Sequence, residues 1–90
     1  MKGMKKIKRL MEKNMGLFEH PLRSFSVVKK NKCILCEFGF RIDNEELMTM
    51  THLSPELVLD INDDIIKEII NMVNDEVKDA IKKRHNKLKK

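Results

Sequence analysis

Residues 63 to 86 repeat apolar side chains every three or four positions, and no other feature of the chain restricts its fold so strongly. This spacing places the apolar residues on one face of an α-helix. Asn62 can cap such a helix, Asp63 and Asp64 suit its positive end, and the cations after residue 81 suit its negative end. A helix with one long apolar face needs another element to cover that face. The residues of the face are Ile66, Ile69, Ile70, Val73, Val77, Ala80, Ile81 and Leu88.

The middle of the chain supplies that element, because it alternates apolar and polar residues as strands do. Residues 25 to 30 predict a strand, Asn31 suits a tight turn, and residues 33 to 42 predict a longer strand. A turn at residues 43 to 46 and a third strand at residues 47 to 53 follow. The apolar face of the second strand is formed by its even positions, which are Ile34, Cys36, Phe38, Phe40 and Ile42.

Two segments complete the predicted architecture. Residues 4 to 15 have helical apolar spacing and are followed by Gly16, so we expect a first helix there. Residues 57 to 61 alternate and favour a short fourth strand; the alternative is a helix that begins at Ser54 with Pro55 at its first position. The sequence therefore predicts an α+β fold. It has an N-terminal helix, a three- or four-stranded antiparallel sheet, and a long C-terminal helix packed on one sheet face.

The length and composition favour one small domain over residues 1–90, with lysine-rich ends. No apolar run approaches the ~20 residues of a membrane span. The positive N-terminus has no apolar stretch after it, so a secretory signal is not expected and we predict a cytoplasmic protein.

The net charge of +5 hides a strong segregation of charge along the chain. Residues 1 to 13 carry six cations and one acid, and residues 82 to 90 carry six cations and no acid. Residues 43 to 81 hold eleven acids against Lys67 and Lys78. The first helix places its cations near its N-terminus, where the helix dipole disfavours positive charge. Either these cations have a role other than helix stability, or the first turn is frayed.

The pair Cys33 and Cys36 suggests thiol chemistry, but its position in a predicted strand argues against it. Three residues along a strand separate the two α-carbons by ~10 Å, and the side chains point to opposite faces. That separation exceeds the ~7 Å limit for a disulfide. A zinc site needs more ligands, and the three histidines are scattered. We therefore expect two free cysteines, no metal and no cofactor.

Phe38-Gly39-Phe40 is similar to the middle of an aromatic motif with which some RNA-binding sheets stack bases. Both rings share the apolar face of the second strand, so packing in the core is the favoured interpretation. No nucleophile with its base, phosphate loop or paired-carboxylate site is recognisable, and we expect a protein that is not an enzyme. The element order also occurs in small double-stranded-RNA-binding domains. Asn62-Asp63-Asp64 replaces the glycine- and lysine-rich helix start expected there, so we assign no family.

Two binding functions are compatible with this charge pattern. The favoured hypothesis is a nucleic-acid-binding protein, for RNA rather than DNA, that contacts the phosphate backbone through its basic ends and hairpin. The alternative is a protein-binding regulator or inhibitor, of the kind that phages encode, whose acidic surface at residues 43–81 meets a basic partner. The last helix also offers a face for a homodimer, although the sheet needs the same residues. The candidate nucleic-acid-binding residues are Lys5, Lys6, Lys8, Arg9, Lys29, Lys30, Lys32, Arg41, Lys82, Lys83, Arg84 and Lys87.

Overall fold

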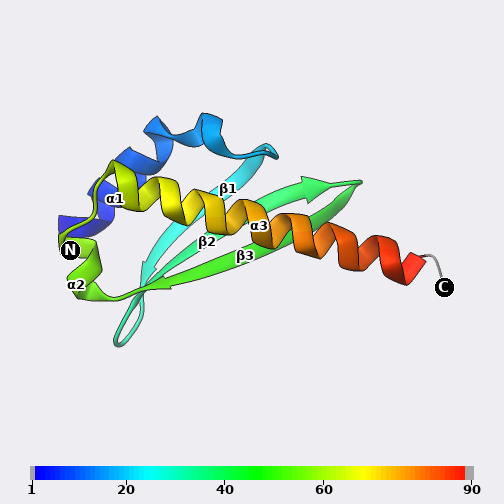
Figure 1. Cartoon of the computed structure of the whole chain (residues 1–90). Helices are drawn as coiled ribbons and strands as arrows, with labels where there is room; N and C mark the ends of the chain where they lie inside the picture. Colours follow the sequence, from blue (N-terminus) through cyan, green and yellow to red (C-terminus); the bar gives the residue numbers. More distant parts are fainter. Residues whose placement is uncertain (1, 89–90) are drawn as a thin grey trace.

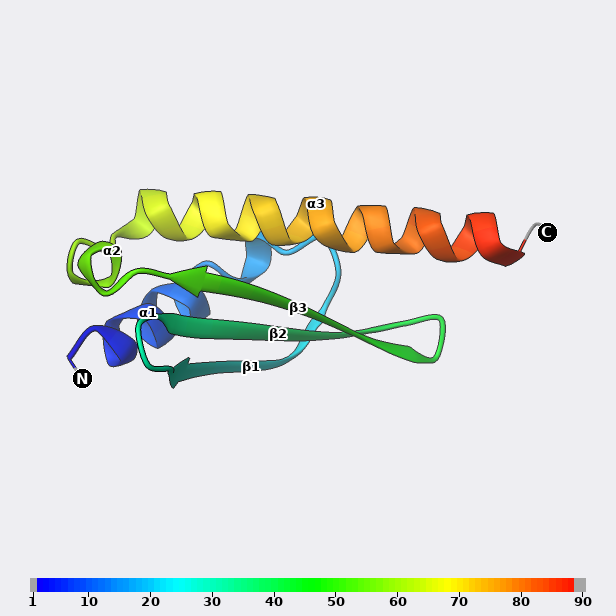
Figure 2. The ribbon, with the colours of Figure 1, turned by 90° about the horizontal axis from the view of Figure 1, so that it is seen from below.

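A helical layer packs on one face of a three-stranded sheet. The computed structural model describes the backbone of residues 2–88 and the side chains of residues 3–84. In chain order the elements are α1 (Lys2–Lys13), the 3₁₀ turn η1 (Met15–Leu17), β1 (Leu22–Lys29), β2 (Ile34–Ile42), β3 (Glu45–Leu53), α2 (Pro55–Leu59) and α3 (Asp63–Leu88). The strands form an antiparallel sheet in the order β1-β2-β3 (Figure 1). Figure 2 shows α3 running along one side of all three strands, as the sequence predicted.

Within the described residues, no helix combines the length and the apolar character that a bilayer span requires.

A two-residue turn joins β2 to β3. Asp43 and Asn44 have φ angles of 53° and 66°, in the left-handed region that Asn and Asp tolerate better than most residues. Glu45 and Glu46 already pair with β2, so β3 begins two residues before the expected start. The turn is tighter than the four residues predicted from sequence.

The core lies between the sheet and the helices. The even positions of β2 point into it, and the Phe38 side chain is 0% exposed. α3 contributes its predicted apolar face, with Ile66, Ile70 and Val73 fully buried, and α1 adds Ile7. The periodicities of three to four residues in the helices and of two in the strand therefore placed the core correctly.

The expected fourth strand is wrong, and the alternative helix is the correct reading. Pro55–Leu59 forms α2, with Ser54 as the residue that caps it. The Leu57 amide donates to the Ser54 hydroxyl at 3.2 Å, and Pro55 occupies the first turn, where its missing amide hydrogen costs nothing. Val58 and Ile61 are buried while Leu59 is exposed, which is a helical rather than an alternating pattern of burial.

α1 begins two residues earlier than expected and is held at both ends. A Cβ on Gly3 would meet Val58 Cγ1, so the first turn packs closely against α2. At the other end, the Lys13 ammonium and the Asn14 amide donate to the Asp63 carboxylate at 3.1 and 3.0 Å. These two hydrogen bonds, the Asn14 bond first, hold the pKa of Asp63 below its usual range. Gly16 lies within η1 and does not end the helix.

Asn74 attaches the segment after η1 to α3. Its side-chain amide donates to the Leu17 carbonyl at 3.0 Å, and its oxygen accepts from the Glu19 amide at 3.1 Å. This clamp places the Phe18 ring over the sheet, with its centroid 5.9 Å from that of Phe38.

Candidate nucleic-acid interface

The structure separates the candidate cations into two groups at opposite ends of the molecule. α1, α2 and the β1–β2 loop lie at one end, which we call the hairpin end (Figure 1). The β2–β3 turn and the C-terminal part of α3 lie at the other, which we call the turn end, and Figure 2 agrees with this separation. The longest dimension of the molecule is 47 Å, so one short ligand segment cannot contact every candidate cation.

The hairpin end gathers seven of the twelve candidates. Lys5, Lys8 and Arg9 are exposed on α1 and Lys6 is half-buried, and the loop lysines are exposed. Within the described residues, none of the seven forms an ion pair. The loop is closed by a hydrogen bond of 2.9 Å from the Lys30 amide to the Cys33 carbonyl, which presents its side chains around a shallow concavity. The seven are Lys5, Lys6, Lys8, Arg9, Lys29, Lys30 and Lys32.

Acids also lie at the hairpin end. α2 carries the exposed Glu56 and ends beside the exposed Asp60, and α3 begins with Asp63 and Asp64. The Asp63 carboxylate already accepts hydrogen bonds from the side chains of Lys13 and Asn14. The basic surface is therefore strongest on α1 and on the loop, and it is interrupted at α2.

At the turn end the candidates divide further. The Arg84 guanidinium lies 2.9 Å from the Glu45 carboxylate and donates to the Glu46 carbonyl at 3.3 Å, so this side chain ties α3 to β3. Its role in ligand binding stays a prediction, and these contacts give it a structural role as well. Lys82 and Lys83 are exposed and so is Arg41. The side chain of Lys87 lies outside the described residues.

Arg23 joins Arg41 at the turn end, and the sequence analysis missed it. The register of β1 against β2 shifts between Leu22 and Ser24, which leaves Arg23 as the extra residue of a bulge. Its side chain lines a hollow in the sheet. A bulge arises from the pairing of two strands, and nothing in the local sequence marks it.

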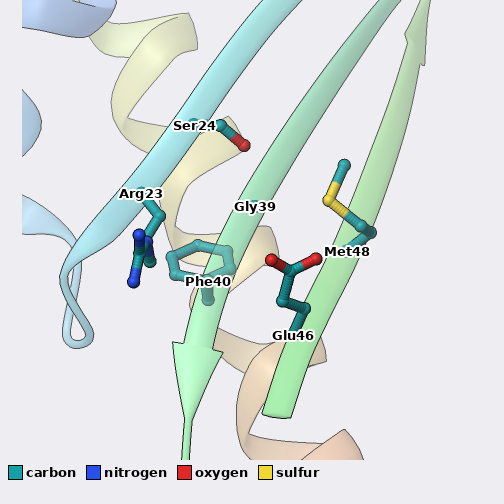
Figure 3. Close-up of a pocket in the computed structure, with 6 residues that line it drawn as sticks. All are labelled: Arg23, Ser24, Gly39, Phe40, Glu46 and Met48. Carbon is teal, nitrogen blue, oxygen red and sulfur yellow. The ribbon is translucent and has the colours of Figure 1, made fainter. Parts of the chain in front are cut away.

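In the part of the chain that the structure describes, no helix covers the face of the sheet opposite α3. We call it the open face; Figure 3 views part of it, with α3 visible behind the strands. β2 contributes Leu35, Glu37, Gly39 and Arg41 to this face. The register places the neighbouring side chains of β1 and β3 beside them, and these are Ser24, Ser26, Val28, Glu46, Met48, Met50 and His52. Met48 and Met50 are 51% and 56% exposed, although each has a large apolar side chain.

A hollow of about 230 Å³ lies in the open face near the turn end. Gly39 makes room for it, since a Cβ there would meet the Ser24 hydroxyl and lie 3.1 Å from the Met48 sulfur. In Figure 3 the Met48 thioether and the Glu46 carboxylate both point from β3 toward Gly39. The described residues include no ion-pair partner for this carboxylate. The lining residues are Arg23, Ser24, Gly39, Phe40, Glu46 and Met48.

The phenylalanines are turned away from this face. Phe38 and Phe40 are buried in the core, as predicted, and Phe25 and Phe18 pack against them. The chain has no other aromatic residue of the Phe, Tyr or Trp type. The Phe38-Gly39-Phe40 segment therefore contributes Gly39, and not its rings, to the open face.

The acidic residues of α3 form a strip on the side that points away from the sheet. Asp64, Glu68, Asp75 and Asp79 are all exposed, and their spacings of four, seven and four residues place them on one helix face. Glu45 does not belong to this strip, because Arg84 binds it at the turn end. The acidic surface expected from residues 43–81 is thus narrower than the sequence suggested.

Cys33 lies in the β1–β2 loop, beside the loop lysines, and Cys36 lies in β2. Both are free. Cys36 is fully buried, and burial raises the pKa of its thiol to about 11, so it stays protonated at neutral pH. Among the residues that the structure describes, no three His, Cys, Asp or Glu side chains are grouped to hold a metal ion.

Comparison of the chain with protein-family models, with curated proteins and with solved structures gave no match. The function is therefore argued from the surfaces themselves.

Proposed function

We propose that this chain is a non-catalytic nucleic-acid-binding protein, with RNA as the preferred form, that grips the phosphate backbone from its hairpin end. The observation that carries the proposal is the set of seven cations on α1 and the β1–β2 loop, none of them in an ion pair within the described residues. Exposed, unneutralised Lys and Arg side chains release counterions when they meet phosphates, and this release drives backbone binding.

The position of the α1 cations adds support. Positive charge in the first turn of a helix costs about 0.3–1 kcal/mol per group at low salt, because it opposes the helix dipole. Lys5 is the fourth residue of α1 and lies at the end of this turn. Ligand binding gives a reason for charges that the helix itself does not favour.

The segregation of acids is the second support. The strip on α3 lies on the side away from the sheet, whereas the β1–β2 loop with its exposed lysines lies at one end of the sheet (Figure 1). A polyanion is repelled by the strip and attracted to the hairpin end, so its approach is oriented.

The experiment compares two variants with equal net charge. Lys30→Ala/Lys32→Ala removes two cations from the hairpin end, and Lys67→Ala/Lys78→Ala removes two from α3. Binding to labelled RNA and DNA of one sequence is followed by fluorescence anisotropy over a series of salt concentrations. We expect the hairpin variant alone to reduce the slope of log Kobs against log [salt] by about 1.4–1.8, at about 0.7–0.9 per phosphate contact. Undetectable binding of the parent at low salt, or equal slopes for the two variants, contradicts the proposal. RNA that binds no better than DNA removes the stated preference.

The acidic strip supports a second candidate function, that of a protein-binding regulator. Met72 lies on the same side of α3 and is 53% exposed, so the strip combines charge with an apolar contact. An apolar anchor surrounded by charge suits a basic protein partner.

A further inference from the structure

We infer that the open face of the sheet binds a single-stranded stretch of the nucleic acid, and that the hollow at Gly39 receives one guanine base. This inference rests on the proposed function and adds a site and a ligand to it. Three features of the open face support it: the charge at its two ends, the exposed methionines between them, and the polar groups around the hollow.

Cations border the open face at both ends, and neutral side chains fill most of it. Arg23 and Arg41 lie at the turn end, while Lys30 and Lys32 lie in the loop at the other end. β2 and β3 run the whole distance between these ends as nine-residue strands. A ligand that matches this surface has negative charge along its backbone and neutral, partly apolar groups that can lie on the sheet. Single-stranded nucleic acid has this combination, because its phosphates are separate from its bases.

The same charges oppose a second copy of the chain as the occupant. If two open faces stack about a twofold axis, each cationic end meets either the same end or the other cationic end of its partner. Both arrangements bring like charges together.

A duplex does not match the open face either. Its bases are paired and stacked, so the exposed Met48 and Met50 side chains meet only sugar and phosphate. Unpaired bases offer apolar ring faces to such thioether groups. Methionine adapts to ring surfaces, and its sulfur makes favourable contacts with aromatic rings.

The hollow at Gly39 has the chemistry for one particular base. The Glu46 carboxylate points toward it and presents two acceptor oxygens. Guanine carries two adjacent N–H donors on its Watson–Crick edge, and a carboxylate accepts both in parallel. Adenine and cytosine offer one amino group to the same carboxylate, and uracil offers a single ring N–H. Met48 can cover the ring face, and Arg23 on the bulge can reach the neighbouring phosphate.

The test uses two fluorescein-labelled RNA octamers, one of uridine throughout and one with guanosine at a central position. We expect the parent protein to bind the guanosine octamer about tenfold more tightly, as one bidentate contact implies. Glu46→Gln, which replaces one acceptor oxygen by a donor, should reduce this ratio to about one. Glu68→Gln makes the same chemical change in the acidic strip of α3 and should keep the ratio at its parental value.

A second pair of variants places the site on the sheet. Met50→Glu adds a carboxylate to the open face and should weaken binding of both octamers at least tenfold. Met72→Glu adds one to α3 at a residue of similar exposure, 53% against 56%, and serves as the control. Circular dichroism checks that all variants are folded.

Each outcome decides between the claims. If the parent binds neither octamer at low salt, the proposed function fails together with this inference. If the parent binds both octamers equally, or if Met50→Glu binds as well as Met72→Glu, the proposed function stands and this inference is wrong. Sedimentation of the parent and of Met50→Glu tests the remaining occupant. If the parent is a dimer and Met50→Glu is a monomer, the open face binds a second copy of the chain, and the inference is wrong.

Discussion

The two faces of β2 are formed by the same nine residues, but they differ in burial. On the covered face, Cys36, Phe38 and Phe40 are almost completely buried beneath the helices. On the open face, Glu37, Gly39 and Arg41 alternate with them and have no helix above them. Packing with the helical layer determines the covered face. The open face is free of that requirement, so its charges, its glycine and its neighbouring methionines are available for a ligand. Four predictions test this difference between the two faces, beginning with the greatest expected change in stability.

Phe38→Ala should destabilise the protein by about 3–5 kcal/mol, because it leaves a cavity where a fully buried ring packs against Phe25 and Phe18. Met50→Ala, on the next strand but on the open face, is the matched control and should change the free energy of unfolding by less than about 1 kcal/mol. Urea denaturation followed by circular dichroism measures both. Equal losses would show that the open face is as tightly packed as the covered one.

Gly39→Ala should cost about 1–3 kcal/mol although it lies on the open face, because the added methyl group overlaps the Ser24 hydroxyl. The double variant Gly39→Ala/Ser24→Ala should recover most of this loss, since the Ser24 Cβ lies at an ordinary contact distance of 3.5 Å from the new methyl group. Thermal unfolding of the single and double variants checks the coupling. A single variant as stable as the parent contradicts the close approach of Ser24 to β2.

The buried thiol of Cys36 makes the stability of the protein depend on pH. Burial on the covered face raises the pKa of Cys36 from 9.0 to about 11, so the folded protein holds this proton at a pH where the unfolded chain has lost it. Its contribution to stability is therefore complete below pH 9 and decreases as the pH rises toward 11. The decrease should amount to about 1 kcal/mol at pH 10.

Cys36→Ala should remove that part of the pH dependence, and Cys33→Ala should leave it unchanged. Urea unfolding of the parent and of both variants at several alkaline pH values measures the part of the pH dependence that belongs to the Cys36 thiol. Iodoacetamide should modify Cys33 in the folded protein before Cys36, because Cys36 is the buried thiol of the two. Simultaneous modification would contradict this difference in access.

The smallest effect on stability is expected for Asp75→Lys/Glu76→Lys/Asp79→Lys, because all three side chains are exposed on α3. We expect a change below about 0.5 kcal/mol per site. On the nucleic-acid proposal, this folded variant binds RNA at least as tightly as the parent, since repulsion is removed. On the regulator proposal, it loses its protein partner in a pull-down. If it keeps every partner and binds RNA as the parent does, the acids only solvate the helix.

The exposure of the candidate cations was partly predictable. The loop lysines were expected to be exposed because charged residues next to a predicted turn are exposed in almost any fold. The ion pair of Arg84 was not expected, because its partner Glu45 lies 39 positions earlier in the chain. Arg23 and the Gly39 hollow were missed because both depend on how β2 meets its two neighbours.

The sequence alone was sufficient to predict α1, α3, the three strands and the residues of the core, because their repeats of two and of three to four residues are local and strong. It also determined the charge blocks. Tertiary packing was needed to show that residues 55–59 are helical, because their sequence pattern was compatible with a strand and with a helix. In the folded chain Val58 packs against Gly3 of α1. Tertiary packing likewise decided which cations lie at the same end, which one is used to hold α3, and which face of the sheet stays open. These properties depend on pairs of residues far apart in the chain, and the distance between such residues is set only when the layers pack.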